Sequence, residues 1–263
     1  MINTKSGLIV CLLLIVAMTM NASSHSLWVE SRDMAKVGDS QVAYSLFGHP
    51  SSSTGMYVPL MESYFLKTPD GKKLDLKMEN GTWLPGFGWM NYSYCDIALD
   101  QPGDHILASI RAPGVYDPAW HGGESSPQLV CDYAKAIIHC GDKSSSDWDA
   151  GFPLEVVLDK APYEMKAKDN LTGAIKFEGK PIKANYTAWY WTEDSNAQKG
   201  NSNENGEFDI ALTKSGPWII EASCTVDQPG NWTATYSSAH YNAGESVPYQ
   251  KVWYRSTVTL WVR

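Results

Sequence analysis

Short segments in which apolar and polar residues alternate recur along this chain, and they restrict it to β-rich folds. Residues 41–47, 105–110, 181–191 and 251–262 each show this period of two. Turn signals lie between such segments, for example Asp or Asn followed by Gly, and the run Glu178-Gly179-Lys180-Pro181. Many short strands separated by turns are typical of β-sandwich domains. We therefore expect an all-β protein.

The N-terminal segment has the pattern of a cleaved secretory signal peptide. An apolar run over 8–20 follows Lys5 and leads to Ala22-Ser23-Ser24. No second apolar run is long enough to cross a membrane. We therefore expect the mature chain, beginning at His25, in the periplasm or at the extracellular surface. A formal charge of −8 without a cluster of Lys or Arg argues against a nucleic-acid partner.

The length of 263 residues leaves room for two ordinary domains after the signal peptide. A fresh series of strands and turns begins near residue 159. We predict the following division: a signal peptide at 1–24, an N-terminal β-sandwich with a candidate metal site at 25–158, and a C-terminal β-sandwich at 159–263. The one helix candidate is 127–139, which begins with a proline suited to a first helical turn, although its tail could equally be a strand.

Cleavage after Ser24 would give His25 a chemical property that no internal histidine has. An N-terminal histidine offers a metal ion its free α-amine and its imidazole in one chelate, and neutral imidazole suits nickel, copper and zinc. A cut one or two residues earlier would place the histidine second or third, and a third-position histidine makes a different, square-planar copper or nickel site. A histidine that merely follows a cleavage site is the alternative.

Further histidines are candidate ligands. A strand that begins at His25 would pair beside the strand that ends at His49, which would bring the two imidazoles together. His121 lies in a Gly-rich loop, and His105 would join them if its strand ends at the same edge. Two carboxylates are candidate acceptors for a ligand imidazole N–H: Glu30 and Asp104. The other histidines are expected to be bystanders: His139 and His240.

Four cysteines follow the signal peptide: Cys95, Cys131, Cys140 and Cys224. An even number in an exported chain suggests up to two disulfides, for which three pairings exist. Closeness in sequence favours Cys131–Cys140. A cysteine metal site is disfavoured because no Cys-x-x-Cys spacing occurs.

Five segments carry a family resemblance: His25-Ser26-Leu27-Trp28-Val29-Glu30, Phe47-Gly48-His49-Pro50, Phe177-Glu178-Gly179-Lys180-Pro181, Asn203-Glu204-Asn205-Gly206-Glu207-Phe208 and Gly216-Pro217-Trp218-Ile219-Ile220. Together they resemble the NikM-like family of exported components of nickel or cobalt uptake, and the last three match its motifs in order and spacing. Two departures occur, since a phenylalanine is missing after His49 and His105 stands where an aromatic residue is usual. The resemblance implies immunoglobulin-like or transthyretin-like β-sandwiches, Ni²⁺ or Co²⁺ as the bound ion and a membrane metal-uptake transporter as the partner. It gives weight to His25 and His49.

These observations together predict an exported nickel- or cobalt-binding protein that is not an enzyme and that passes the ion to a transporter. Two alternatives stay open. One is a copper-binding histidine-brace protein or oxidase acting on polysaccharide, with aromatic side chains such as Trp189, Trp191 and Trp232 stacked on sugar rings. The other is a cell-surface module that binds carbohydrate or protein without a metal. No Gly-x-Ser-x-Gly, His-Glu-x-x-His or phosphate-loop motif occurs.

Overall fold

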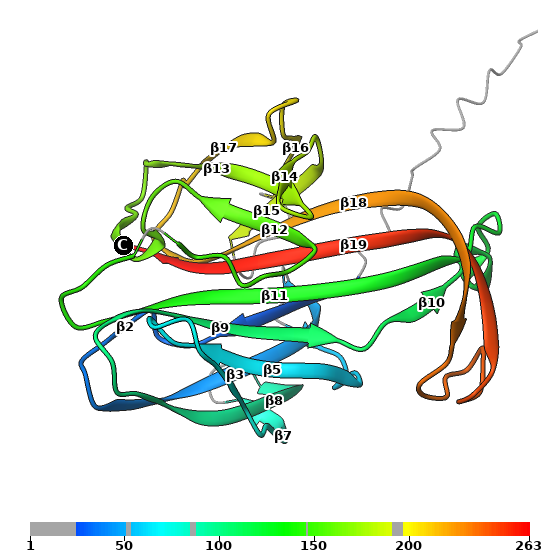
Figure 1. Ribbon diagram of the computed structural model, residues 1–263, viewed down its shortest axis with the longest axis horizontal. Helices are drawn as coiled ribbons and strands as arrows, with labels where there is room; N and C mark the ends of the chain where they lie inside the picture. Colours follow the sequence, from blue (N-terminus) through cyan, green and yellow to red (C-terminus); the bar gives the residue numbers. More distant parts are fainter. Residues whose placement is uncertain (1–24, 51–53, 85–87, 146, 191–196) are drawn as a thin grey trace, which may run out of the picture.

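The computed structural model describes residues 25–263 except 51–53, 85–87, 146 and 191–196. These residues form β-strands and short 3-10 turns (Figure 1), which confirms the prediction of an all-β sandwich. Within the described ranges, we find no helix that combines the length and the apolar character needed to cross a bilayer. The predicted signal peptide at 1–24 lies outside the described residues.

The strands, in chain order, are β1 (Ser26–Glu30), β2 (Met34–Ala35), β3 (Asp39–His49), β4 (Thr54–Gly55), β5 (Met61–Lys67), β6 (Lys73–Asp75), β7 (Glu79–Leu84), β8 (Gly88–Leu99), β9 (Gly103–Arg111), β10 (Gly114–Tyr116), β11 (Gln128–Cys140), β12 (Leu154–Leu158), β13 (Asn170–Phe177), β14 (Lys180–Pro181), β15 (Asn185–Tyr190), β16 (Gln198–Asn201), β17 (Glu207–Ala211), β18 (Gly216–Thr233) and β19 (Ser246–Val262). The 3-10 turns η2 (Pro118–His121) and η3 (Pro162–Glu164) follow β10 and β12.

The described strands are arranged in three sheets. The first sheet has the order β1-β3-β8-β7, with β4 beside β3. The central sheet has the order β16-β15-β18-β19-β11-β9-β5-β6, with β2 and β10 beside β11. The third sheet contains β12, β13, β14 and β17. In Figure 1 the third sheet lies above the long strands of the central sheet, and β3, β7 and β8 lie below them.

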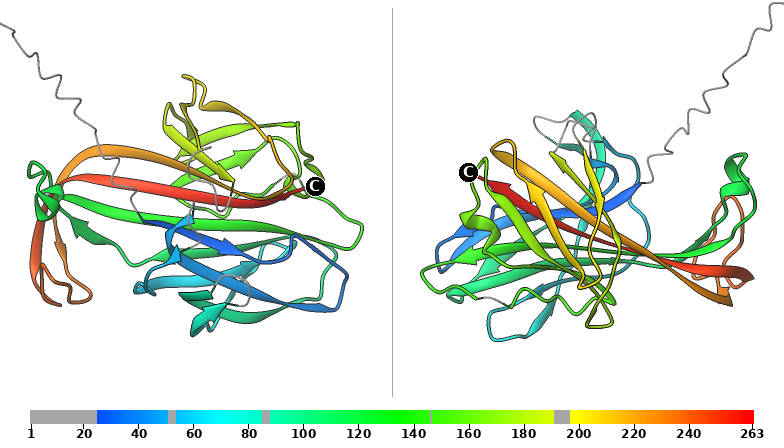
Figure 2. Two further views of the ribbon diagram at one scale, coloured as in Figure 1. Left: turned by 180° about the vertical axis from the view of Figure 1, so that it is seen from behind. Right: turned by 90° about the horizontal axis from the view of Figure 1, so that it is seen from above.

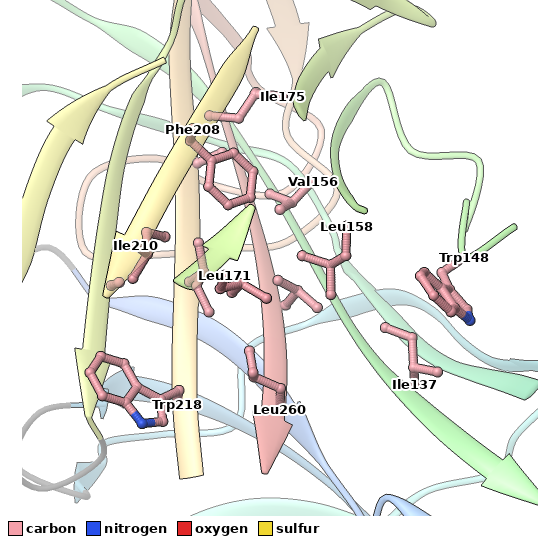
Figure 3. Packing of buried hydrophobic residues seen from close by; sticks show 14 of the residues in the cluster. Ile137, Trp148, Val156, Leu158, Leu171, Ile175, Phe208, Ile210, Trp218 and Leu260 are labelled. Carbon is pink, nitrogen blue, oxygen red and sulfur yellow. The ribbon is translucent and has the colours of Figure 1, made fainter. Parts of the chain in front are cut away.

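The middle strands of the central sheet, such as β9 and β11, are buried on both faces because the first and third sheets cover opposite sides of it. Leu107 and Ile138 pack with Leu27 of the first sheet. Their chain neighbours Ile106 and Ile137 point the other way, into the large core shared with the third sheet (Figure 3). Successive side chains of a strand face opposite sides, so each strand here contributes to two cores.

The central sheet takes strands from both sides of the predicted boundary at 158/159. Strand β11 pairs in parallel with β19, from Gln128 opposite Lys251 to Ala136 opposite Thr259. The boundary itself falls at the end of β12, a strand of the third sheet. The two halves of the chain therefore share one continuous sheet. A parallel pairing between strands so distant in sequence leaves no local pattern from which to predict it.

The segment proposed as a helix candidate is strand β11. It lies between β19 and β9 and is covered on both faces. A strand in this position reads as a nearly continuous apolar run, as in residues 134–138, because neither face needs polar side chains. This explains why a period of two was hard to see there.

The Glu178-Gly179 turn is a two-residue hairpin between β13 and β14, as predicted from the sequence. Phe177 pairs with Lys180, and the turn residues have φ values of 49° and 76°. Positive φ at both central positions is the geometry of the hairpin turn that matches strand twist. Gly179 supplies the second position without steric cost.

Strands β18 and β19 continue past the sheet as a long curved ribbon (Figures 1 and 2). We call residues 234–245, between the two strands, the ribbon tip. Tyr236 and Tyr241 of the tip lie against β10 so closely that a Cβ atom at Gly114 would collide with both hydroxyl groups. Glycine at this position therefore permits the tip to fold over β10.

Candidate functional site

The two histidines at the start of β1 and the end of β3 lie side by side. The strands pair antiparallel, with Ser26 opposite Gly48 and Leu27 opposite Phe47. The same register places His25 opposite His49, and the two imidazole centroids are 4.7 Å apart with an interplanar angle of 75°. The expected proximity of these rings is thus present, at the edge of the first sheet.

The spacing of the two rings suits a shared transition-metal ion. An imidazole nitrogen binds such an ion at about 2.0–2.1 Å, and the ring centroid lies about 1.2 Å further out, so two adjacent ligands at right angles have centroids about 4.5 Å apart. The observed 4.7 Å is close to this value. Among the described side chains, no group of three or more His, Cys, Asp or Glu is arranged to hold a metal. A third protein donor at this pair would be the α-amine of a cleaved chain.

A buried charge cluster anchors the backbone of His25. Asp132 of β11 accepts hydrogen bonds from Arg111 of β9 and from Arg255 of β19, both at 2.6 Å. Arg255 also donates to the carbonyl oxygen of His25 at 2.6 Å. Burial by itself would raise the pKa of Asp132, but the charges of Arg255 and Arg111 outweigh it and hold the pKa below its usual value. The cluster therefore stays charged and fixes His25.

The surroundings of His25 favour its neutral imidazole. Burial lowers the pKa of His25, and the nearby positive groups His49, Arg255, Arg111 and His121 lower it further. A neutral imidazole carries the free lone pair that a metal ion needs. Burial and charge therefore favour a His25 imidazole whose lone pair is free.

A cavity of about 810 Å³ opens beside His25. Its walls come from Phe47 of β3, residues 57–60, β10 with η2, and the ribbon tip, and both Arg111 and Arg255 line it. The walls are mostly apolar, and none of the lining residues is acidic. His49 is not among the lining residues, so an ion held between the two rings would sit at the cavity wall. A volume of this size is typical of sites for small organic molecules.

Two further histidines lie at the rim of this cavity. His240 of the ribbon tip stacks on Trp120 of η2, with ring centroids 3.8 Å apart and an interplanar angle of 5°. His121 stacks on Tyr116 at 5.8 Å. His121, which the sequence predicted as a ligand, therefore lines the same cavity as His25. His240 lines it as well, although no sequence pattern indicated a role for it.

A scan against family models places most of this chain in one family. The model described as a domain of unknown function, DUF4198, matches residues 22–226. The chain belongs to the DUF4198 family. The match includes the predicted ligands from His25 to His121 and ends within β18, so the ribbon tip and β19 of this DUF4198 protein lie outside it. No curated protein matches the chain.

Solved structures resemble this DUF4198 chain only distantly. The tetra-tandem repeat in the extending region of a large adhesion protein is 12% identical with a TM-score of 0.25, and the match covers 91% of this chain and 49% of that one. Red sea bream transglutaminase is 7% identical with a TM-score of 0.21, over 91% and 31% of the two chains. A marsupial T cell receptor is 7% identical with a TM-score of 0.21, over 88% and 73%. The chain thus spans about half or less of the length of the first two proteins.

The DUF4198 fold does not bring His105 or Asp104 to the histidine pair. Both lie at the start of β9, six or more residues from Arg111, which is about 20 Å along a strand. His105 is 1% exposed in the core, where burial lowers its pKa. Asp104 does contact an imidazole nitrogen, as expected of such an acceptor, but that of His139, at 2.8 Å.

Glu30 lies on the other face of β1 from His25, because the two residues are an odd number of positions apart. It accepts a hydrogen bond from the indole of Trp28 at 2.6 Å and lines a separate hollow with Arg32 and Tyr44. Burial raises the pKa of Glu30 to about 8. The structure therefore places Glu30 apart from the candidate ligands.

The favoured Cys131–Cys140 disulfide is wrong. Both residues lie on strand β11, nine positions apart, which is about 30 Å in an extended strand. A disulfide needs Cα atoms within about 7 Å. The four described cysteines are all free thiols: Cys95, Cys131, Cys140 and Cys224.

No local sequence pattern marks the residues that complete the site. Arg111, Asp132 and Arg255 lie on three different strands, and no local spacing links them. Tyr57 and the ribbon-tip residues carry no motif either. Of the tryptophans considered for sugar stacking, Trp189 and Trp232 pack in apolar clusters, and Trp191 lies outside the described residues.

Proposed function

We propose that this protein is an exported transition-metal-binding protein that holds a nickel or cobalt ion between His25 and His49. Within the DUF4198 family, the sequence resemblance points to the NikM-like group. The ion would be captured in the periplasm or at the extracellular surface and passed to a membrane uptake transporter. The observation that carries the proposal is the 4.7 Å spacing of the two imidazole rings.

The surroundings of the pair support this proposal. Arg255 fixes the carbonyl group of His25, so cleavage before this residue would leave an α-amine held beside the imidazole. The amine, the imidazole of His25 and the imidazole of His49 give three nitrogen donors, which suit borderline ions such as Ni²⁺ and Co²⁺. Burial and neighbouring positive charges lower the pKa of His25 and keep it ready to bind.

The proposed mechanism is ligand exchange without catalysis. Three nitrogen donors leave the remaining positions of an octahedral ion to water or to another ligand. A partner that offers more donors then draws the ion away, because affinity is set by the type, number and geometry of the ligands. We therefore propose a carrier and not an enzyme.

The test is a calorimetric titration of two forms of the protein with Ni²⁺ and Co²⁺. One form begins at His25, and the other keeps Ser24 in front of it. We expect one-to-one binding to the first form and at least a hundredfold weaker binding to the second, since the extra residue removes the free amine from the chelate. Equal affinity of the two forms would exclude the amine as a ligand.

Two histidine variants assign the second ligand. His49→Ala should weaken Ni²⁺ binding at least tenfold, whereas His240→Ala, a matched change at the cavity rim, should leave it unchanged. The reverse order would overturn the assignment. Cu²⁺ is titrated in parallel, and because it binds nitrogen sites more tightly than Ni²⁺ in general, its higher affinity alone decides nothing. Copper-dependent oxidation of a polysaccharide would instead favour the histidine-brace enzyme.

A further inference from the structure

The cavity beside His25 is far larger than a metal ion requires. An ion with a few water molecules fills a small part of about 810 Å³. The walls are mainly apolar, and the lining contains no carboxylate to hold a hydrated ion. Volumes and linings of this kind are typical of sites for small organic molecules.

The fixed charges that line the cavity suit an anion better than a bare divalent cation. Arg111 and Arg255 both line it, and Asp132, which binds both, is a single negative charge against two positive ones. Glu221 also lies near Arg255, but it is not among the residues that line the cavity, and burial raises the pKa of its carboxyl. The lining next to the histidine pair therefore carries two guanidinium groups and no carboxylate. Such a wall repels a free cation and attracts an anion.

Flat side chains line the same space. Tyr57 lies 6.3 Å from the ring of His25, and the stacked pair of Trp120 and His240 forms the opposite rim. Aromatic walls of this type bind flat, conjugated groups by stacking. The cavity thus combines stacking surfaces and positive charge with a pair of nitrogen ligands at its edge.

We propose that the cavity receives the metal ion as a complex with a small, flat organic carboxylate chelator. The carboxylates would face Arg111 and Arg255, and the ion would complete its coordination with His25 and His49. This inference rests on the proposed metal-binding function and names the chemical form of its cargo.

The probe is Ni²⁺ bound one-to-one by pyridine-2,6-dicarboxylate, a planar tridentate chelator that leaves half of an octahedral coordination sphere open. The protein that begins at His25 is titrated with Ni²⁺ alone, with the Ni²⁺ complex and with the chelator alone. We expect the protein to bind the complex as one unit. Its affinity for the complex should be at least tenfold higher than the value expected if the protein and the chelator only competed for free Ni²⁺. Its d–d spectrum should shift as the nitrogen ligands replace water.

The outcomes separate this inference from the function on which it rests. If Ni²⁺ alone binds and the chelator only strips it from the protein, the chelate inference is overturned and the metal-binding function stands. If neither Ni²⁺ nor its complex binds, the metal-binding function itself is overturned. Equal binding of the metal-free chelator would also overturn the inference, because the cavity would then be a site for organic acids alone.

Substitutions of two cavity residues, Arg111 and Trp120, provide a second test, which compares binding of the complex with binding of Ni²⁺ alone. Arg111→Gln should weaken binding of the complex at least tenfold more than it weakens binding of Ni²⁺ alone, because only the complex carries carboxylates that Arg111 can bind. Structural damage would weaken both. Lys183→Gln, the same charge change at an exposed site, is the matched control. If Arg111→Gln fails to fold, Trp120→Ala tests the stacking wall, with the same selective loss expected.

Discussion

The two ends of the β9–β11 pair contain similar groups in opposite settings. At one end Asp132 binds Arg111 and Arg255 beside the cavity, with the histidine pair next to them. At the other end Asp104 lies opposite His139 in the register of the same two strands, in closed core. Each end therefore has a buried aspartate and nearby histidines, but only one end opens to a cavity.

The closed end shows why an aspartate beside a histidine is not by itself a binding site. The carboxylate of Asp104 contacts four groups: the Nδ1 atom of His139, the indole of Trp148, the backbone N–H of Ser145 and the hydroxyl of Tyr163. These partners occupy both oxygens, and a buried polar group satisfied in this way holds the core together. At the open end Asp132 is shared between two guanidinium groups, and both of these line the cavity.

The largest effect is expected from breaking the charge cluster at the open end. Asp132→Asn leaves two buried guanidinium groups without their counter-charge and should lower the free energy of unfolding by about 3–5 kcal/mol. Denaturant titration measures this loss. Asp227→Asn, which breaks an exposed pair with Lys251, should have no measurable effect. A similar loss in both variants would mean that the open-end cluster contributes no more than a surface ion pair.

A substitution at the closed end should change the stability of the protein and not its affinity for Ni²⁺. Asp104→Asn replaces one carboxylate oxygen, which accepts hydrogen bonds, by an NH₂ group, which cannot accept them from the surrounding donors. We therefore expect the free energy of unfolding to fall by about 2–3 kcal/mol. The affinity of the remaining folded protein for Ni²⁺ should stay unchanged. A parallel loss of affinity would show that the two ends of β9 are coupled and would remove the distinction between them.

The smallest effect is a pH dependence of stability in the metal-free protein. Burial and positive neighbours lower the pKa of His25 in the folded state, so the unfolded chain binds a proton that the folded chain does not. The free energy of unfolding should therefore fall as the pH drops through the ordinary histidine value of 6.5. His25→Gln should flatten this part of the curve.

The closed end contributes to the same pH range, and a second variant separates the two. Burial lowers the pKa of His105, so this residue destabilises the fold in acid in the same direction. His105→Gln should remove this contribution without affecting metal binding. A pH profile of stability that neither substitution changes would contradict the lowered pKa values at both ends.

The sequence alone predicted three of the long strands and the meeting of two histidines, whereas the predicted strand at 181–191 is interrupted between β14 and β15. Alternation of apolar and polar side chains reports which face of a strand is buried, and residues 41–47, 105–110 and 251–262 lie within β3, β9 and β19. The proximity of His25 and His49 follows from one antiparallel pairing of neighbouring strands. Local patterns carry this information because they depend on residues close together in the chain.

Only the tertiary structure decided what surrounds that pair. The parallel pairing of β11 with β19 joins the two halves of the chain and places Arg255 beside Asp132, while Arg255 reaches the carbonyl of His25 from 230 positions away. The extended conformation of β11 separates Cys131 from Cys140 and excludes their disulfide. The alternation of apolar and polar residues shows which side chains of a strand share a face, but it does not show which strand pairs with it. The charge cluster and the cavity therefore follow only from the packing of the whole chain.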